Sequence, residues 1–331
     1  MAKKVVTLGE IMMRLNTSGN DRFSQARQLS VFYGGAEANV AVSLARWGLE
    51  AVHVTALPDN AIGEAAGRDL QQFGVSVEQV FYIPGRMGLY FMETGSMQRS
   101  SQIIYDRFNS AFSNFGGEEV DWDRVFEGAD CFHWTGITPA LSRKAADLTL
   151  KAIKAASAKG LLISGDINYR RNLWNFGVDP LEVMPELISY SNLIVAGATD
   201  LYNCLGIDEE DYEVACRMAM SKHAAIKFIT NTERNHISAT HNKLRGQLWD
   251  RENMMVSKTY DMPQIVDRVG GGDAYVAGLI YGLLHMRSDE AVEFATAAAV
   301  LKHSIPGDKN LASLEEVQDL VKGENVGRLL R

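Results

Sequence analysis

A run of three glycines followed by an aspartate lies near the carboxyl-terminal end of the sequence. Gly270, Gly271 and Gly272 come directly before Asp273, and the apolar segment 274–284, which is typical of a helix, follows. Glycines at the start of a helix let backbone N–H groups converge on an anion, which the helix dipole also attracts. A carboxylate beside such an anion hole is well placed to accept a proton from an attacking hydroxyl. The arrangement indicates phosphoryl transfer to an alcohol, with Asp273 as the general base.

The same segment has other interpretations. The glycines could form a flexible loop, and Asp273 could act only as a helix N-cap. The segment is not a Walker A loop, because no Lys-Ser or Lys-Thr pair follows the glycines. It also differs from the dinucleotide-binding fingerprint, which follows a strand and usually lies early in a chain.

A second glycine pair opens another helix-like segment near the amino-terminal end. Gly34 and Gly35 allow a ligand to approach the backbone closely, and helical periodicity extends over residues 36–47 before Gly48. A glycine pair at the start of a helix is weakly specific by itself. In combination with the later G-G-G-D run it is much more specific.

The two segments resemble the two signatures of the ribokinase-like (PfkB) carbohydrate kinase family. Gly34, Gly35 and Asn39 match its GG-x-x-x-N sugar-site segment. Residues 267–273 match its D-x-x-G-x-G-D segment, which carries the anion hole and the catalytic base. Further stretches, spread over nearly the whole chain, are similar to the 2-keto-3-deoxygluconate kinases of this family. They are GLY at 88–90, Tyr105 with Arg107, GITPAL from Gly136, DINYR at 166–170 with Leu173 and Trp174, and KHSIPGD at 302–308.

The resemblance implies an α/β fold, a ribokinase-like three-layer α/β/α arrangement with a mostly parallel central sheet and a small β-sheet lid. A single kinase domain would cover residues 1–331, and the inserted segments 11–33 and 79–110 would build the lid. The implied reaction is ATP-dependent phosphorylation of 2-keto-3-deoxy-D-gluconate at its primary hydroxyl, which gives the 6-phosphate. Mg²⁺ is the implied metal, a monovalent cation is a further candidate, and the metal ligands are unassigned. A cytoplasmic homo-oligomer is expected.

Two arginines suit a sugar acid, because a planar guanidinium can hold a carboxylate with two parallel hydrogen bonds. Arg107 and Arg170 are these candidates, and an ordinary surface arginine is the alternative for each. By resemblance, the substrate-binding residues are Gly34, Gly35, Asn39, Tyr90, Tyr105, Arg107, Arg170 and Asp308. For the tyrosines the alternative is packing within the lid, and for Asp308 it is a Gly-Asp turn. The nucleotide-binding residues implied by the resemblance are Asn168, Arg170, Thr230, Arg234, Gly270 and Gly272.

Two departures from the family pattern concern the nucleotide region. The sequence GATD at 197–200 replaces the N-x-x-E motif that organises the magnesium and phosphate region, and Asp200 is its candidate substitute. The K-x-G-x-x-G pattern is missing after Lys227, so residues 230–234 are the candidate wall for adenine. His133 and His303 are expected to be packed histidines, and Asp267 is either a turn residue or a functional one.

Composition and periodicity support this class of protein. The chain has 331 residues, 46% of them hydrophobic, and a net charge of −8 without a long basic run, which argues against nucleic acid as a partner. The three cysteines lack metal-type spacing, and the longest apolar run, 274–284, is too short to span a membrane. Strands at 5–9, 131–134, 161–166, 193–196 and 226–230 alternate with helical segments, which predicts βαβ units and a parallel sheet.

Three rival functions stay open at this level. The first is a kinase for another sugar, such as 2-keto-3-deoxygalactonate, fructose or ribose. The second is a sugar-binding regulator without catalysis, against which the intact G-G-G-D run argues. The third is an NAD-dependent dehydrogenase, against which the lack of a glycine fingerprint near the amino-terminal end argues.

Overall fold

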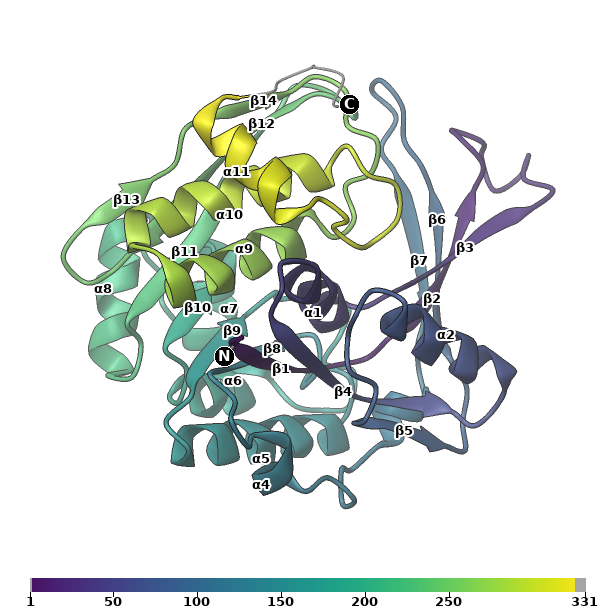
Figure 1. The fold of residues 1–331 in the computed structure, drawn as a ribbon, viewed down its shortest axis with the longest axis horizontal. Helices are drawn as coiled ribbons and strands as arrows, with labels where there is room; N and C mark the ends of the chain where they lie inside the picture. Colours follow the sequence, from purple (N-terminus) through teal and green to yellow (C-terminus); the bar gives the residue numbers. More distant parts are fainter. Residues whose placement is uncertain (1, 325–331) are drawn as a thin grey trace.

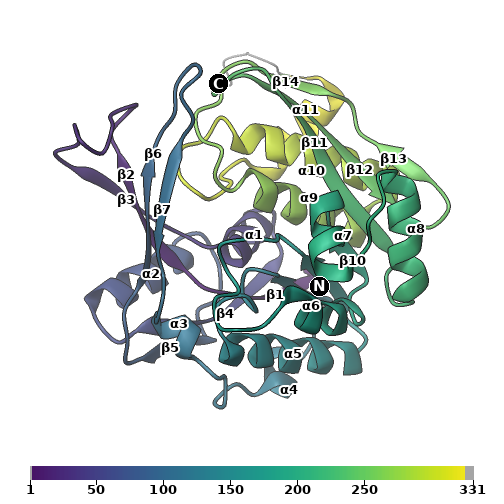
Figure 2. The same ribbon diagram turned by 180° about the vertical axis from the view of Figure 1, so that it is seen from behind.

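The computed structural model describes residues 2–324, which build a large ten-stranded sheet and a separate four-stranded sheet (Figures 1 and 2). The order in the large sheet is β13-β12-β11-β10-β9-β8-β1-β4-β5, and β14 pairs with β12. The strands from β5 to β11 are parallel, and the pairs that involve β12 are antiparallel. The bounds are β1 Lys4–Leu8, β4 Glu50–Pro58, β5 Val80–Ile83, β8 Cys131–Thr135, β9 Leu162–Asp166, β10 Leu193–Val195, β11 Phe228–His236, β12 Asn242–Trp249, β13 Met254–Val256 and β14 Tyr260–Met262.

Helices cover both faces of the large sheet, because the parallel strands are apolar on both sides. Alternating residues of β1 show this: Val5 packs into one hydrophobic core and Val6 into another. One face carries α1 Ala36–Arg46, α9 Gly271–His285, α10 Ser288–Lys302 and α11 Leu314–Lys322. The other face carries α3 Ala111–Asn114, α4 Trp122–Val125, α5 Arg143–Ala158, α6 Pro180–Ile188, α7 Ala198–Leu205 and α8 Tyr212–Lys222. The expected three-layer α/β/α arrangement with a mostly parallel sheet is confirmed.

The small sheet projects from the large one at the side of α2 Ala61–Gln71 (Figure 1). Its order is β3-β2-β6-β7, with bounds β2 Met12–Thr17, β3 Leu29–Gly34, β6 Gly88–Glu93 and β7 Gln102–Asp106. These strands fall within the two segments proposed for a lid, apart from Gly34 at the end of β3, and the second segment needs a correction. Val80–Ile83 pairs with β4 of the large sheet, so the second segment joins the small sheet only from Gly88 onward. Movement of the small sheet as a lid stays a prediction.

Glycine signals in the sequence locate the end of α1 and the start of α9. Helix α1 ends at Arg46, and Gly48 follows it with a φ of 87°. Helix α9 begins at Gly271, after Gly270 with a φ of 80°, a left-handed conformation that favours glycine. Strand β11 is longer than predicted, because it continues to His236 as an antiparallel ribbon with β12. No helix within residues 2–324 has the length and apolar character needed to cross a membrane.

Candidate active site

Both sheets contribute to one cleft of about 510 Å³. Met12, Tyr90 and Tyr105 line it from the small sheet. Asp166 lines it from the carboxyl end of β9, and Asp200 lines it from α7, which follows β10. A cleft at the carboxyl ends of parallel strands is the usual place for a ligand in an open α/β sheet.

The glycine loop enters this cleft with N–H groups that are available to a ligand. Among residues 2–324, the N–H groups of Gly270, Gly272 and Asp273 have no acceptor, whereas that of Gly271 donates to the Arg268 carbonyl at 3.4 Å. A Cβ at Gly270 would collide with the carbonyl of Asp308, so a larger residue does not fit there. The N–H groups of Gly270, Gly272 and Asp273 are therefore available for the anion hole, which stays a prediction, whereas that of Gly271 already has an acceptor.

Asp273 lies on the first turn of α9 and faces the same cleft. The amide Nδ2 of Asn39 donates to its Oδ2 at 2.7 Å. Burial raises the pKa of Asp273 to about 7, and the nearby Glu37 and Asp308 act in the same direction, while Asn39 and Arg170 oppose the shift. A carboxyl group with a pKa near 7 can exchange a proton with a hydroxyl at neutral pH, as a general base must.

Two further carboxyl groups, those of Asp166 and Asp200, line the same cleft as Asp273. Burial, together with Asp200 and Asp273, raises the pKa of Asp166 well above its ordinary value. Burial also raises the pKa of Asp200, whose oxygens accept the N–H groups of Gly197 at 2.8 Å and Tyr169 at 2.9 Å. Sequence reasoning missed Asp166 as a site residue, although its position at the end of a buried strand was a usable signal. Three or more His, Cys, Asp or Glu residues grouped for a metal ion are not found within residues 2–324.

The two predicted carboxylate-binding arginines differ in their surroundings. Arg107 is only 6% exposed, which rules out the surface alternative. Its Nε donates to Oε2 of Glu10 at 2.8 Å, and its Nη2 donates to the same oxygen. Arg170 is exposed, and among residues 2–324 its guanidinium has one hydrogen-bond acceptor, the Tyr169 carbonyl, 3.3 Å from Nη1. Arg107 therefore already shares its charge with Glu10, a residue that the sequence did not point to, whereas Arg170 is free to meet a ligand.

A buried ion-pair network joins the small sheet to the loop before the glycines. Arg14 of β2 is 1% exposed, and its guanidinium contacts Asp267 at 2.8 Å and Asp308 at 3.1 Å. Tyr90 donates its hydroxyl to Asp308 as well. Asp267 also accepts the N–H groups of Val269 and Gly307, each at 3.0 Å, so it is both a turn residue and an ion-pair partner.

Most of the remaining predicted site residues line the cleft, and Thr230 does not. Those that line the cleft include Gly34, Gly35, Asn39, Asn168, Arg234 and Asp308. Thr230 was assigned wrongly to the nucleotide site, because it is fully buried and its hydroxyl bonds to the Gln247 carbonyl at 2.6 Å and the Tyr275 hydroxyl at 2.7 Å. The sequence pattern did not indicate that β11 continues beyond Thr230, or that Tyr275 of α9 packs against this residue. His133 is a packed histidine as expected, with its ring 3.1 Å from the Ser164 hydroxyl.

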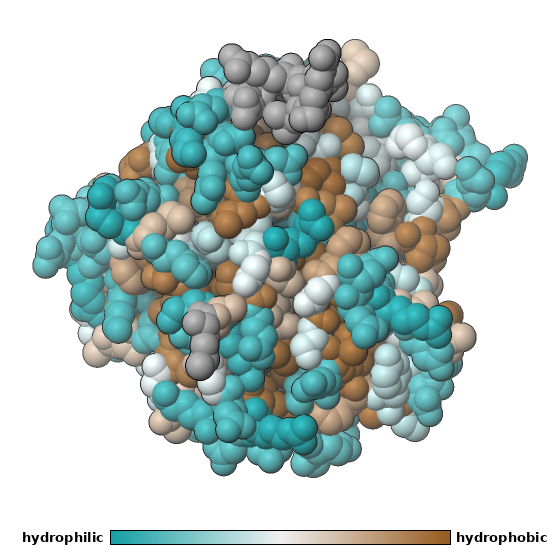
Figure 3. Space-filling view, viewed as in Figure 1, coloured by the Kyte–Doolittle hydropathy of each residue, from teal (hydrophilic) through white to brown (hydrophobic). Residues whose placement is uncertain are grey.

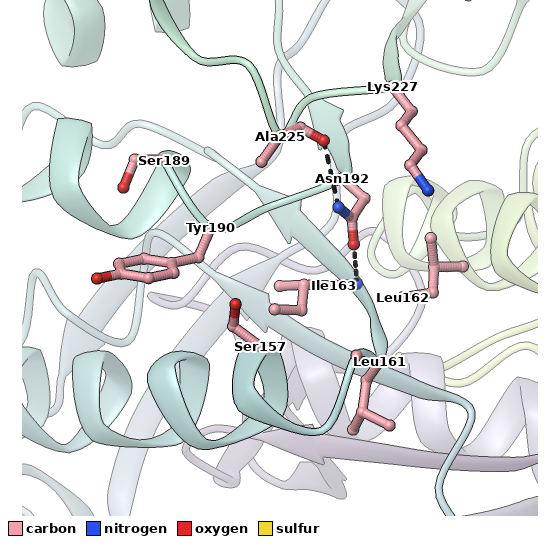
Figure 4. A pocket seen from close by; sticks show the side chains of 10 residues that line it. Ser157, Leu161, Leu162, Ile163, Ser189, Tyr190, Asn192, Ala225 and Lys227 are labelled. Carbon is pink, nitrogen blue, oxygen red and sulfur yellow. Dashed lines mark hydrogen bonds between the residues drawn. The ribbon is translucent and has the colours of Figure 1, made fainter.

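A second hollow, of about 380 Å³, lies at the opposite, amino-terminal ends of β9, β10 and β11 (Figure 4). The amide of Asn192 bridges it by accepting the Ile163 N–H at 2.9 Å and donating to the Ala225 carbonyl at 3.2 Å. Its described lining contains Lys227 and Tyr190 but no carboxylate. The hollow therefore lacks the groups for proton transfer that the cleft contains.

Comparisons with known proteins find relatives that match nearly the whole chain. Residues 2–313 match the model of the pfkB family carbohydrate kinases. A 2-dehydro-3-deoxygalactonokinase from Haloferax volcanii is 30% identical over 328 residues, which are 99% of each chain. A 2-dehydro-3-deoxygluconokinase from Bacillus subtilis is 27% identical over 93% of this chain and 92% of its own.

Solved structures are similar over almost the whole length. The 2-dehydro-3-deoxygluconokinase of Thermotoga maritima is 40% identical, with a TM-score of 0.91 over 97% of this chain and all of its own. A ribokinase II assigned in E. coli, solved in complex with ATP and Mg²⁺, shares the fold, with 19% identity and a TM-score of 0.83 over 97% of this chain and 100% of its own.

Proposed function

Because the chain belongs to the pfkB family of carbohydrate kinases, we propose that this sugar kinase transfers the γ-phosphoryl group of ATP to the primary hydroxyl of 2-keto-3-deoxy-D-gluconate. The observation that carries the reaction type is Asp273, with its pKa raised to about 7, beside N–H groups that have no acceptor within residues 2–324. The observation that favours an acidic sugar is the pair Arg107 and Arg170, which line the same cleft.

The proposed mechanism uses two neighbouring parts of α9. Asp273 accepts the proton of the sugar hydroxyl as its oxygen attacks phosphorus, and Asn39 holds the carboxylate through its hydrogen bond. The N–H groups of Gly270, Gly272 and Asp273 stabilise the negative charge on the transferring phosphoryl group. The amino-terminal end of the helix dipole acts in the same direction.

The donor set of the cleft fits Mg²⁺, which prefers oxygen ligands and keeps several waters. Asp166 and Asp200 would hold the ion with the phosphates, because burial raises the pKa of both carboxyl groups, the charges of Asp200 and Asp273 raise that of Asp166 further, and a divalent cation would offset these shifts. When bound, the ion neutralises phosphate charge. The ATP and Mg²⁺ complex of the E. coli relative supports this choice of cofactors for the fold.

A second candidate substrate is the epimer 2-keto-3-deoxygalactonate. The name of the Haloferax volcanii relative favours it, whereas the name of the Thermotoga maritima structure favours the gluconate form. Both carry the carboxylate that Arg107 and Arg170 suit, so the arginines do not separate them. A neutral sugar such as fructose or ribose gains nothing from these guanidinium groups.

A coupled ADP-release assay across four acceptors tests the proposal. The panel is 2-keto-3-deoxygluconate, 2-keto-3-deoxygalactonate, fructose and ribose, each with ATP and Mg²⁺. We expect the highest kcat/KM for the gluconate form and the lowest values for the neutral sugars. A neutral sugar with the highest kcat/KM would contradict the sugar-acid assignment.

Cytoplasmic location and homo-oligomeric assembly also stay predictions, and light scattering of the full chain tests the assembly.

A further inference from the structure

Two arginines of the cleft carry positive charges that no carboxylate among the described residues balances. Arg234 of β11 and Arg268, two residues before Gly270, both line the cleft and are partly buried. Within residues 2–324 neither forms an ion pair, in contrast to Arg14 and Arg107, whose guanidinium groups contact aspartate or glutamate. Partly buried charge without a partner is costly, so an anion that enters the cleft would find both groups uncompensated.

Arg234 is held in place by His303. Nδ1 of His303 lies 2.6 Å from the Ala299 carbonyl, which can only accept, so Nδ1 carries the proton. Nε2 therefore presents its lone pair, and Nη2 of Arg234 donates to it at 3.2 Å. The ring is 2% exposed, and burial together with neighbouring positive charges lowers the pKa of His303 to about 4, which keeps it neutral. The Nε and Nη1 groups of Arg234 have no partner among the described residues.

Arg268 is anchored on one side only. Its Nε donates to the Ala239 carbonyl at 3.0 Å, and its Nη2 donates to the Ser238 carbonyl at 2.9 Å. Its Nη1 has a single long contact, 3.5 Å from Nδ1 of His236. The positive charge of Arg268 lowers the pKa of Arg234 in addition to burial, so the two guanidinium groups sense each other.

The pair is also attached to the glycine loop. A Cβ at Gly271 would overlap the ring of His303, so this histidine packs directly against the loop and carries Arg234 with it. The carbonyl of His303 accepts the N–H of Val266 at 2.8 Å, which ties the same histidine to the chain just before Arg268. Arg234, Arg268 and the free N–H groups of the glycine loop thus belong to one connected wall of the cleft.

We propose that Arg234 and Arg268 form a phosphate clamp that binds the phosphate chain of the nucleotide, with His303 as the positioning residue of Arg234. This inference rests on the proposed function and names the groups that would hold the phosphates at that site. A guanidinium group can donate parallel hydrogen bonds to phosphate oxygens. Nε2 of His303 only accepts, from Nη2 of Arg234, so it does not compete with phosphate for the other N–H groups of this arginine. The clamp contacts the phosphates and not the nucleobase, so inorganic tripolyphosphate should bind to it.

Calorimetric titration of the full chain with tripolyphosphate in the presence of Mg²⁺ tests the clamp. We expect Arg234→Gln and Arg268→Gln each to weaken binding at least about tenfold, because each removes a charge-assisted contact. His303→Leu should weaken binding in the same direction. His303→Gln should retain most of it, because the glutamine oxygen can accept from Arg234 where Nε2 did. Thermal melting of each variant shows whether it is folded.

The matched control is Arg245→Gln on β12. Arg245 is exposed on the same β11–β12 ribbon and pairs with Glu233, so this variant removes one positive charge away from the cleft. Its tripolyphosphate affinity should stay within about twofold of wild type. Wild-type affinity in Arg234→Gln and Arg268→Gln would overturn the clamp, and so would an equal loss in Arg245→Gln. If His303→Leu fails to fold, Arg234→Gln and His303→Gln still decide the matter.

This experiment is independent of the sugar. If the protein phosphorylates none of the proposed sugar acids but loses tripolyphosphate binding in the two arginine variants, the proposed substrate is wrong and the clamp stands. If sugar-acid kinase activity is found and the arginine variants bind tripolyphosphate like wild type, the clamp is wrong and the function stands.

Discussion

The chemistry of single residues in this cleft depends on how each charge is balanced. Asp273 carries a pKa raised to about 7 because burial outweighs the hydrogen bond from Asn39. Arg107 is neutralised in place by Glu10, and Arg170 is exposed. Substitutions at these positions should therefore differ in kind, with some changing proton transfer, some substrate affinity and some stability.

The pH dependence of the reaction should report the carboxyl group of Asp273. Because the base must be deprotonated, kcat/KM should fall as the pH drops below about 7 and level off above it. Asn39→Ala removes the hydrogen bond that lowers this pKa, so the descending limb should move to higher pH. Rate profiles of both proteins between pH 5 and pH 9 measure the shift, and superimposable limbs would show that Asp273 is not the titrating group.

Arg107→Ala should lower both the stability of the protein and its affinity for the sugar acid, whereas Arg170→Ala should affect activity alone. Loss of Arg107 leaves Glu10 buried without its partner, which typically costs about 3–5 kcal/mol of stability. It should also raise KM for the sugar acid roughly tenfold to a hundredfold, because a charge-assisted hydrogen bond is lost, and it should barely affect residual activity on a neutral ketose. Arg170→Ala should reduce activity on both substrates but leave the unfolding free energy almost unchanged, since this side chain is exposed and forms no ion pair with the described part of the chain.

Denaturant unfolding and steady-state kinetics of the two variants provide the comparison. Equal losses on acid and neutral sugar in Arg107→Ala would show that this arginine does not recognise the carboxylate. The sugar-acid assignment would then depend on similarity to relatives alone.

Among the secondary-structure elements, the start of α9 is the one on whose backbone conformation phosphoryl transfer should depend most. Gly270 has a φ of 80°, and a Cβ there would collide with the Asp308 carbonyl, so Gly270→Ala should distort the anion hole and greatly reduce kcat. Gly160 after α5 is the matched control, because its φ is 70° and nothing lies near its missing Cβ. Gly160→Ala should cost about 1 kcal/mol of stability and leave kcat unchanged. Equal kcat in both variants would contradict the role of the loop.

Elements explain what the sequence could and could not predict. The helix starts at Ala36 and Gly271, and the aspartate behind the glycines, follow from local patterns, because capping and glycine conformations depend on neighbouring residues. The pairing of Arg107 with Glu10 and of Arg14 with Asp267 joins residues that are distant in sequence, so no local pattern reveals it. Thr230 was assigned wrongly for the same reason, since the ribbon that buries it forms with a later strand.

For the molecule as a whole, we expect the small sheet to close over the cleft when ligands bind. Ile103 and Tyr105 of β7 line the cleft and are 40% and 53% exposed, so closure would bury apolar surface that now contacts water. Figure 3 shows hydrophobic surface on the side of the molecule where this sheet projects. The buried Arg14 network would act as the fixed end of the movement, because it attaches β2 to the loop before the glycines.

Hydrogen exchange tests the closure of the small sheet. Strands β2, β3, β6 and β7 should exchange faster than the parallel core without ligand, and their protection should rise on addition of the sugar acid with a non-hydrolysable ATP analogue. Protection in β8 and β9 should hardly change and serves as the internal control. Equal protection of the small sheet in both states would contradict a lid.

The central claim is that Asp273 is the general base of a sugar kinase, and turnover of Asp273→Asn tests it most directly. An amide is nearly isosteric and can still contact Asn39, but it cannot accept the hydroxyl proton. We expect folding and nucleotide affinity close to wild type, with kcat for the best sugar acid reduced by roughly 10²–10⁴. A purified, folded Asp273→Asn protein that keeps more than about a third of wild-type kcat, against that general-base range, would contradict the account.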